Sequence, residues 1–313
     1  MSKNDEKRQR IFDKYVSNRN LLIDNGFLEG EKDTYICPIC LEAHKTIDGK
    51  DPLSLEDAPP KSLGGKSNTL TCKSCNNEAG HTIDFHLTER LRELDSTAFL
   101  PNTETKVKIK FDDQITNATI NVDAHGKISM FHSKKNNHPI KLEEQMVGLK
   151  GGEVVNLEFL KTRVIPEKLE YALLKTAYIL AFERFGNSII YDSCFDIVRE
   201  QLNNPDERIY PENFWFTPPY PKEMEGVYFV CDKGLESILV IFNLDTGNSL
   251  RKFGVFLPCP VNDIATVLER LNEQFADEKN LTLKLYPWEQ DDKYLEDIEQ
   301  IKTMHQWISN RKK

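Results

Sequence analysis

The spacing of apolar residues changes along the chain, and each change marks a different kind of element. In the first part the apolar positions lie three, four or seven residues apart among charged residues, which predicts a helix over residues 6–28. From residue 105 the spacing becomes two, with Val107, Ile109 and Phe111 standing between lysines. This alternation is typical of β-strands, and it predicts a β-meander over residues 105–160.

Helical spacing returns after the meander. Pro166 is in a favoured first position and Gly186 in a favoured stop position, so we predict a helix between them and a second helix over residues 190–203. Apolar runs then predict a second sheet, in which Asp245-Thr-Gly-Asn is a good hairpin turn. The chain ends with a predicted helix, strand and helix. The strands predicted in this part of the chain cover residues 227–231, 238–244, 250–257 and 281–286.

Helices and alternating strands together predict an α+β fold with antiparallel sheet. A cluster of cysteines separates a first, smaller part of the chain from a larger one whose motifs indicate no chemistry. We expect an N-terminal helical segment (1–30), a zinc-stapled module (31–97) and a larger α+β domain (98–313) made of the meander (105–160), the helices (166–203) and a second sheet with helices (226–313).

Four of the seven cysteines form two C-x-x-C pairs, Cys37 with Cys40 and Cys72 with Cys75. Each pair can wrap a metal ion in one tight turn, and four thiolates close a tetrahedron around Zn²⁺. Such a site is coordinatively full, so its role is structural. The sequence therefore predicts a zinc ion that joins the two ends of the intervening loop.

Charge and hydropathy limit the classes of function. The net charge of −9 argues against a broad basic surface for nucleic acid, although Lys61, Lys66 and Lys73 supply local positive charge near the cysteines. No apolar run is long enough to span a membrane, and the polar start of the chain lacks the apolar stretch of a signal peptide. We expect a cytoplasmic protein that has no membrane partner.

Polar residues gather inside the loop between the cysteine pairs. Glu56 and Asp57 end a short predicted strand, and they could share a site only where the following prolines break it. A Gly-Gly pair allows close approach of backbone. Asn68 stands before the second cysteine pair, Asn76 follows Cys75, and His81 comes next on the predicted helix.

In this order the residues resemble the zinc-knuckled HNH endonucleases of the ββα-metal class, over residues 35–90 only. The resemblance implies that Glu56 and Asn76 hold a catalytic Mg²⁺ or Mn²⁺, that Asn68 braces the loop, and that His81 is a second candidate ligand. It places Asp57 where the family has its general-base histidine. Aspartate has a pKa of about 3.9, against about 6.5 for histidine, so it is the weaker base.

Three hypotheses follow from the sequence. The first is an HNH-type endonuclease that cleaves DNA, with foreign DNA as one possible target and RNA left open. The second is a catalytically degenerate zinc module that binds nucleic acid or a protein partner without cleavage, a reading that Asp57 and the acidic net charge favour. The third places the function in the C-terminal domain, through a protein partner or a ligand pocket.

Overall fold

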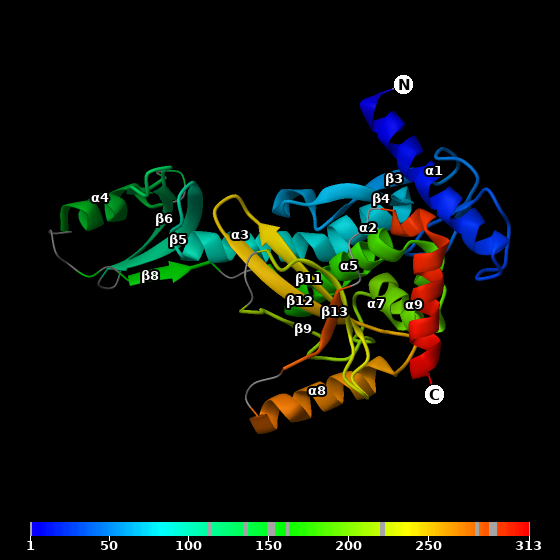
Figure 1. The fold of residues 1–313 in the computed structure, drawn as a ribbon. Coiled ribbons are helices and arrows are strands. Elements are labelled where there is room, and N and C mark those ends of the chain that lie inside the picture. Colours follow the sequence, from blue (N-terminus) through cyan, green and yellow to red (C-terminus); the bar gives the residue numbers. More distant parts are fainter. Residues whose placement is uncertain are drawn as a thin grey trace. The chain divides into compact units, whose positions relative to one another are not determined.

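The chain folds into two compact units, each built from segments that are distant in sequence (Figure 1). Helices and antiparallel sheets are found in the described part of the chain, which confirms the predicted α+β class. The computed structural model describes residues 2–111, 114–133, 135, 137–148, 154, 156–160, 163–219, 223–278, 282–287 and 293–312. Unit 1 comprises Met1–Leu87, Ile165–Asp245 and Leu250–Lys313, and unit 2 comprises Thr88–Val164 and Thr246–Ser249.

These units cut across the ranges that the sequence suggested. The segment predicted as one module, 31–97, contributes to both units, and so does the segment 98–313. The reason is that a long helix after the meander returns to the cysteine-containing segment and packs against it. Unit 1 therefore joins the cysteine module, this helix and the second sheet in one body.

Unit 1 begins with helix α1. It starts three residues before the predicted helix (6–28) and ends four residues before it. Ser2 caps it, because the Ser2 hydroxyl accepts a hydrogen bond from the Asp5 amide while the Asp5 carboxylate accepts one from the Ser2 amide. Two short hairpins and a helical stretch follow. Their bounds are α1 Lys3–Asp24, β1 Tyr35–Ile36, β2 Ala43–His44, β3 Leu53–Ala58, η1 Lys61–Leu63, β4 Lys66–Cys72, α2 Lys73–Ala79 and η2 Gly80–Asp84. Helix α3 (Phe85–Thr97) follows, and its residues from Thr88 onward belong to unit 2.

Helix α5 (Pro166–Phe185) is the central element of unit 1. It has the predicted bounds, with Pro166 in its first turn and Gly186, at φ 56°, as its C-cap. Twelve of its residues are buried, which is the pattern of a helix covered on all sides. One side contacts β3 and β4, and another contacts strands of the second sheet. Helix α5 therefore links the cysteine module to that sheet.

The second sheet has the strand order β13-β10-β11-β12-β9, and all of its pairs are antiparallel. The predicted hairpin is confirmed, with Asp245 of β11 opposite Leu250 of β12. Residue 281 of the predicted strand 281–286 lies outside the described residues. The bounds are α6 Asn187–Ile190, η4 Ser193–Phe195, α7 Asp196–Asn203, β9 Trp215–Phe216, β10 Gly226–Val230, β11 Ile238–Asp245, β12 Leu250–Leu257, α8 Ile264–Glu278, β13 Leu285–Pro287, η5 Tyr294–Glu296 and α9 Ile298–Arg311.

Unit 2 contains the predicted meander as a four-stranded antiparallel sheet of order β7-β6-β5-β8. Val107, Ile109, Ala118 and Ile120 form its buried core, and Phe99 and Leu157 pack against them. Residues 112, 113, 134, 136, 149–153 and 155 of the predicted meander (105–160) lie outside the described residues. The bounds are β5 Thr103–Phe111, β6 Gln114–Val122, β7 Ile128–Phe131, α4 Pro139–Gly148 and β8 Asn156–Phe159. Among the described helices, none combines the length and the apolar character that a bilayer crossing requires.

Candidate metal centre

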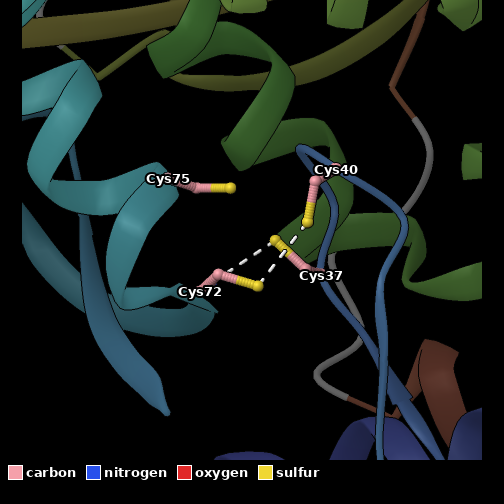
Figure 2. A group of neighbouring side chains, drawn as sticks. All are labelled: Cys37, Cys40, Cys72 and Cys75. Carbon is pink, nitrogen blue, oxygen red and sulfur yellow. Dashed lines mark hydrogen bonds between the residues drawn. The ribbon is translucent and has the colours of Figure 1, made fainter. Parts of the chain in front are cut away.

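The four paired cysteines converge in unit 1, as the sequence predicted. Figure 2 shows that Cys37 and Cys40 come from the turn after β1, whereas Cys72 and Cys75 come from the start of α2. Their four sulfur atoms all lie within 4.8 Å of one another. Zinc–sulfur bonds of about 2.3 Å place tetrahedral sulfurs about 3.8 Å apart, so the group has the donor set and the spacing of a structural zinc site.

Neighbouring groups support these thiolates. The backbone amide of Cys72 points to the Cys37 sulfur at 3.4 Å, and the His44 Nε2 lies 3.1 Å from the Cys72 sulfur. Glu42 and His44, with Cys72, also form a second group of metal-type donors within 4.8 Å of one another. Hydrogen bonds to zinc-bound sulfur orient the ligands and reduce their negative charge.

The β3–β4 hairpin carries three of the predicted catalytic residues, Glu56, Asp57 and Asn68, whereas Asn76 lies on α2 and His81 on η2. The register of the hairpin shifts between Glu56 and Asp57, so the two side chains do not follow the regular alternation of a strand. At the tip, a Cβ on Gly65 would lie 1.5 Å from the Pro59 carbonyl oxygen. The loop therefore requires glycine at position 65. The atoms that exclude a side chain there are backbone atoms of Pro59 and Pro60 in the same loop.

Glu56 points into unit 1 and takes part in a buried ion-pair cluster. The Lys175 ammonium, from α5, lies 2.7 Å from a carboxylate oxygen of Glu56 and 2.7 Å from one of Asp84. The Thr71 hydroxyl also donates to Glu56, at 2.8 Å. Only 4% of the Lys175 side chain and 2% of the Glu56 side chain are exposed. We call Glu56, Lys175 and Asp84 the lysine–acid cluster.

The charges of the lysine–acid cluster do not cancel, because one ammonium faces two carboxylates. Burial raises the pKa of Glu56 and that of Asp84, and the attraction to Lys175 opposes this rise. Burial disfavours the Lys175 ammonium, but the two carboxylates outweigh that effect, so the pKa of Lys175 lies above its ordinary value. The lysine therefore stays protonated and occupies the place of a cation between the two acids.

The other predicted catalytic residues have separate partners. Asp57 accepts a hydrogen bond from Ser67 across the hairpin. The Asn68 amide donates to the Glu183 carboxylate at 2.7 Å, so this asparagine joins β4 to α5. The Asn76 amide nitrogen donates to the Leu55 carbonyl at 2.8 Å and to the Ser54 hydroxyl at 3.1 Å. His81 is solvent-exposed on η2.

The predicted catalytic residues thus lie on one hairpin and on the helical segment that follows it, but those described here contact different partners and do not converge on one metal position. Glu56 has Lys175 as its cationic partner, and the nitrogen of the Asn76 amide is engaged with the backbone of β3. Among the described His, Cys, Asp and Glu residues, the groups of metal-type donors are the four cysteines and the group of Glu42, His44 and Cys72. The assignment of Glu56 and Asn76 as Mg²⁺ or Mn²⁺ ligands stays a prediction.

The three predicted phosphate-binding lysines lie on the surface of the same module. Lys61 opens η1 in the tip of the hairpin, Lys66 begins β4 and Lys73 begins α2. All three are exposed. Their backbone is held between the Pro59–Gly65 contact at one end and the cysteine group at the other, so their spacing is fixed by the fold.

A cavity of about 650 Å³ lies within unit 1, between the tip of the β3–β4 hairpin, α5 and strands β10 and β11. Its volume is that of a small-molecule site. Its charged lining residues include both signs in equal number, and they are Lys14, Lys66, Arg184, Glu183, Glu225 and Asp245. Burial raises the pKa of Glu183, and the hydrogen bond from Asn68 opposes this. The charges of the lining do not select an anionic or a cationic ligand. The cavity is therefore a candidate location for the ligand-pocket hypothesis, but it does not indicate the chemical class of the ligand.

Sequence reasoning missed Lys175, the residue that organises this region. The sequence did contain a signal, because Lys175 stands alone among apolar residues of a helix that is apolar on nearly all sides. A charge in such a place requires a buried partner. It also missed that His86 is buried, where its Nδ1 accepts a hydrogen bond from the Ile165 amide at 3.2 Å. Comparison with known proteins adds no assignment to these contacts: no protein-family model, no curated protein and no solved structure matches the chain.

Proposed function

We propose that the chain is a non-cleaving nucleic-acid-binding protein built on a zinc-stapled ββα module. The observation that carries this proposal is the Lys175 ammonium, which lies 2.7 Å from both Glu56 and Asp84. This ammonium lies where a cation held by Glu56 would otherwise have to bind. This proposal corresponds to the second of the hypotheses drawn from the sequence.

Phosphodiester hydrolysis by a metal ion requires coordination positions that water and phosphate can reach. The Glu56 carboxylate is almost fully buried and is satisfied by Lys175 and Thr71. A divalent ion would have to displace an ammonium that is covalently fixed to α5. Asp57, the weaker base, has Ser67 as its partner. Each of these contacts supports binding without cleavage.

Nucleic acid is the proposed partner because the module presents cations on a rigid frame. Lys61, Lys66 and Lys73 are exposed, and the four-cysteine group fixes the start of α2 relative to the turn after β1. Zinc would be held by Cys37, Cys40, Cys72 and Cys75, where it supplies structure. Lysines at fixed spacing can each neutralise a phosphate and release a counterion.

The test combines a cleavage assay with a binding assay on the zinc-loaded chain. Supercoiled plasmid and labelled single- and double-stranded oligonucleotides are incubated with Mg²⁺ or Mn²⁺. We expect binding that weakens with salt and no metal-dependent cleavage. Cleavage that disappears in Asn76→Ala and persists in Lys168→Met would reinstate the endonuclease hypothesis, because Lys168 of α5 pairs with the exposed Asp206 and not with the lysine–acid cluster.

The binding arm has its own matched variants. We expect the triple change of Lys61, Lys66 and Lys73 to glutamine to weaken binding and to make its salt dependence shallower. Three phosphate contacts on a single strand correspond to a slope change of about 2 in log Kd against log salt. Salt-insensitive binding, or no binding to any nucleic acid tested, would refute the proposed partner.

A further inference from the structure

The sheet of unit 2 has one face that the core does not use. Val107 and Ile109 point into the core, and side chains alternate along a strand, so Lys106, Lys108 and Lys110 of β5 all lie on the opposite face. Positions two residues apart on a strand are separated by about 7 Å. The inner strand β5 therefore carries a row of three lysines at alternate positions.

The neighbouring strands extend this row sideways. In the observed register Lys106 is opposite Thr119 of β6, and Thr119 is opposite Phe131 of β7. Lys108 is opposite Asn117 in the same way. Directly opposed residues of antiparallel strands share a face, so hydroxyl, amide and aromatic groups accompany the lysines. We call this set the lysine face.

Phe131 distinguishes the lysine face from an ordinary solvated sheet surface. Phe131 is 60% exposed, although the opposite side of the sheet offers an apolar core. Ile115, in the same row as Lys110, is 58% exposed. An outer sheet face that only meets water needs neither group. An exposed ring beside a row of ammonium groups is the combination that binds bases by stacking and phosphates by charge.

The acidic residues on the lysine face weaken its charge without removing it. Glu158 of β8 lies 2.7 Å from Lys110 and 3.9 Å from Lys108, and these three side chains are between 41% and 48% exposed. Exposed ion pairs of this kind contribute little and are easily exchanged for another anion. Glu104, opposite Asn121, lies at the end of the row beyond Lys106. Among the strand residues that the structure describes on this face, three lysines therefore accompany two carboxylates.

We propose that the lysine face binds single-stranded nucleic acid, with the lysines of β5 on successive phosphates and Phe131 stacked on a base. A single strand fits better than a duplex, because the bases of a duplex are already stacked and paired and cannot reach an aromatic ring on a flat sheet. This inference rests on the proposed function in that it assumes a nucleic-acid partner, but it concerns a surface in the other unit of the chain.

The test measures binding of a labelled oligothymidine of about 15 nucleotides by fluorescence anisotropy over a range of salt concentrations. Changing Lys106, Lys108 and Lys110 to glutamine is expected to reduce the salt slope by about 2. Phe131→Ala is expected to weaken binding about 5- to 150-fold and to leave the salt slope unchanged. A matched duplex should bind more weakly than the single strand and should not respond to Phe131→Ala.

The triple glutamine variant of Lys61, Lys66 and Lys73 is the comparison variant, since it removes the same charge from unit 1, and under the proposed function it also weakens binding. If that variant loses binding while the lysine-face variants keep wild-type affinity, the inference fails and the proposed function stands. If only the lysine-face variants lose binding, the inference stands and the role given to the unit 1 lysines fails. If the wild-type chain binds no oligonucleotide, both fail. Circular dichroism of each variant shows whether unit 2 has kept its fold.

Discussion

Lys175→Met removes the ammonium from the lysine–acid cluster and keeps a side chain of similar length. In the native chain this ammonium serves two carboxylates at 2.7 Å, in a place where Lys175 and Glu56 are almost fully buried. The variant leaves Glu56 and Asp84 without a cation in a medium that solvates charge poorly. Removing one partner of a buried ion pair costs about 3–5 kcal/mol of unfolding free energy. We expect a loss of that size near neutral pH.

The loss should depend on pH in a defined direction. Burial already raises the pKa of Glu56 and of Asp84, and without Lys175 the hydrogen bond from Thr71 to Glu56 is left as the opposing contribution for Glu56. A carboxyl group whose pKa is higher in the folded chain than in the unfolded chain favours folding at low pH, and this contribution is lost as the pH rises through the folded-state pKa. Lys175→Met should therefore regain stability relative to the native chain as the pH is lowered from about 8 towards 5.

Urea unfolding followed by circular dichroism measures both effects. Lys168→Met is the matched control, because Lys168 pairs with Asp206, which is 84% exposed, and such pairs are worth at most about 1 kcal/mol. Adding Glu56→Gln to Lys175→Met should restore part of the loss by removing one of the uncompensated charges. A loss below about 1 kcal/mol for Lys175→Met, or one that does not change with pH, would contradict the burial and charge argument.

The remaining predictions concern the cysteine group, the two acids, the hairpin tip and a buried histidine. Native mass spectrometry should find one zinc ion per chain and none in Cys72→Ser, while Cys194→Ala keeps its zinc; a chain without zinc after expression in zinc-supplied cells contradicts the structural site. In Lys175→Ala, Mn²⁺ should raise the unfolding midpoint because it replaces the ammonium, whereas Lys168→Ala should not respond; equal responses would mean that the two acids do not form a cation site. Gly65→Ala should cost about 1–3 kcal/mol because its Cβ would meet the Pro59 carbonyl, while Gly49→Ala, with nothing within 4 Å, should be near neutral in the same urea assay. Burial lowers the pKa of His86, whose neutral ring accepts a hydrogen bond at Nδ1. The stability that the neutral ring contributes is therefore lost as the pH falls below about 6.5, the pKa of a free histidine. His86→Asn should make the stability of the chain depend less on pH in this acidic range.

Much of the fold could be predicted because its signals are local. Pro166 and Gly186 mark the ends of α5, and the alternation around Val107 marks β5. The four cysteines were found for the same reason, since C-x-x-C spacing already contains half of the tetrahedron. Strand β9, Trp215–Phe216, had no such signal, because two residues between proline-rich turns show no period. Long alternating or helical runs are predictable, and short pieces held by tertiary contacts are not.

The candidate site was predictable only in part, because its chemistry depends on a residue far away in the chain. Glu56, Asn68 and Asn76 do lie on the expected hairpin and helix. Lys175 is 91 positions from Asp84, and no spacing rule connects residues at that distance. Glu183, the partner of Asn68, is 115 positions away. Both partners come from α5. The side chains of the helix that packs on the hairpin therefore determine which contacts the polar residues of the hairpin make.

Two cations of different kinds would then hold the same hairpin, and they divide its support between them. Zinc in the cysteine group joins the end of β4 and the start of α2 to the turn after β1. The Lys175 ammonium joins Glu56 of β3 to Asp84 of η2 and, through its own backbone, to α5. Neither support needs an ion that exchanges with solvent near the acids. Under the proposed function the fold of the module is therefore independent of catalysis, and its exposed lysines can serve binding while its buried acids serve stability.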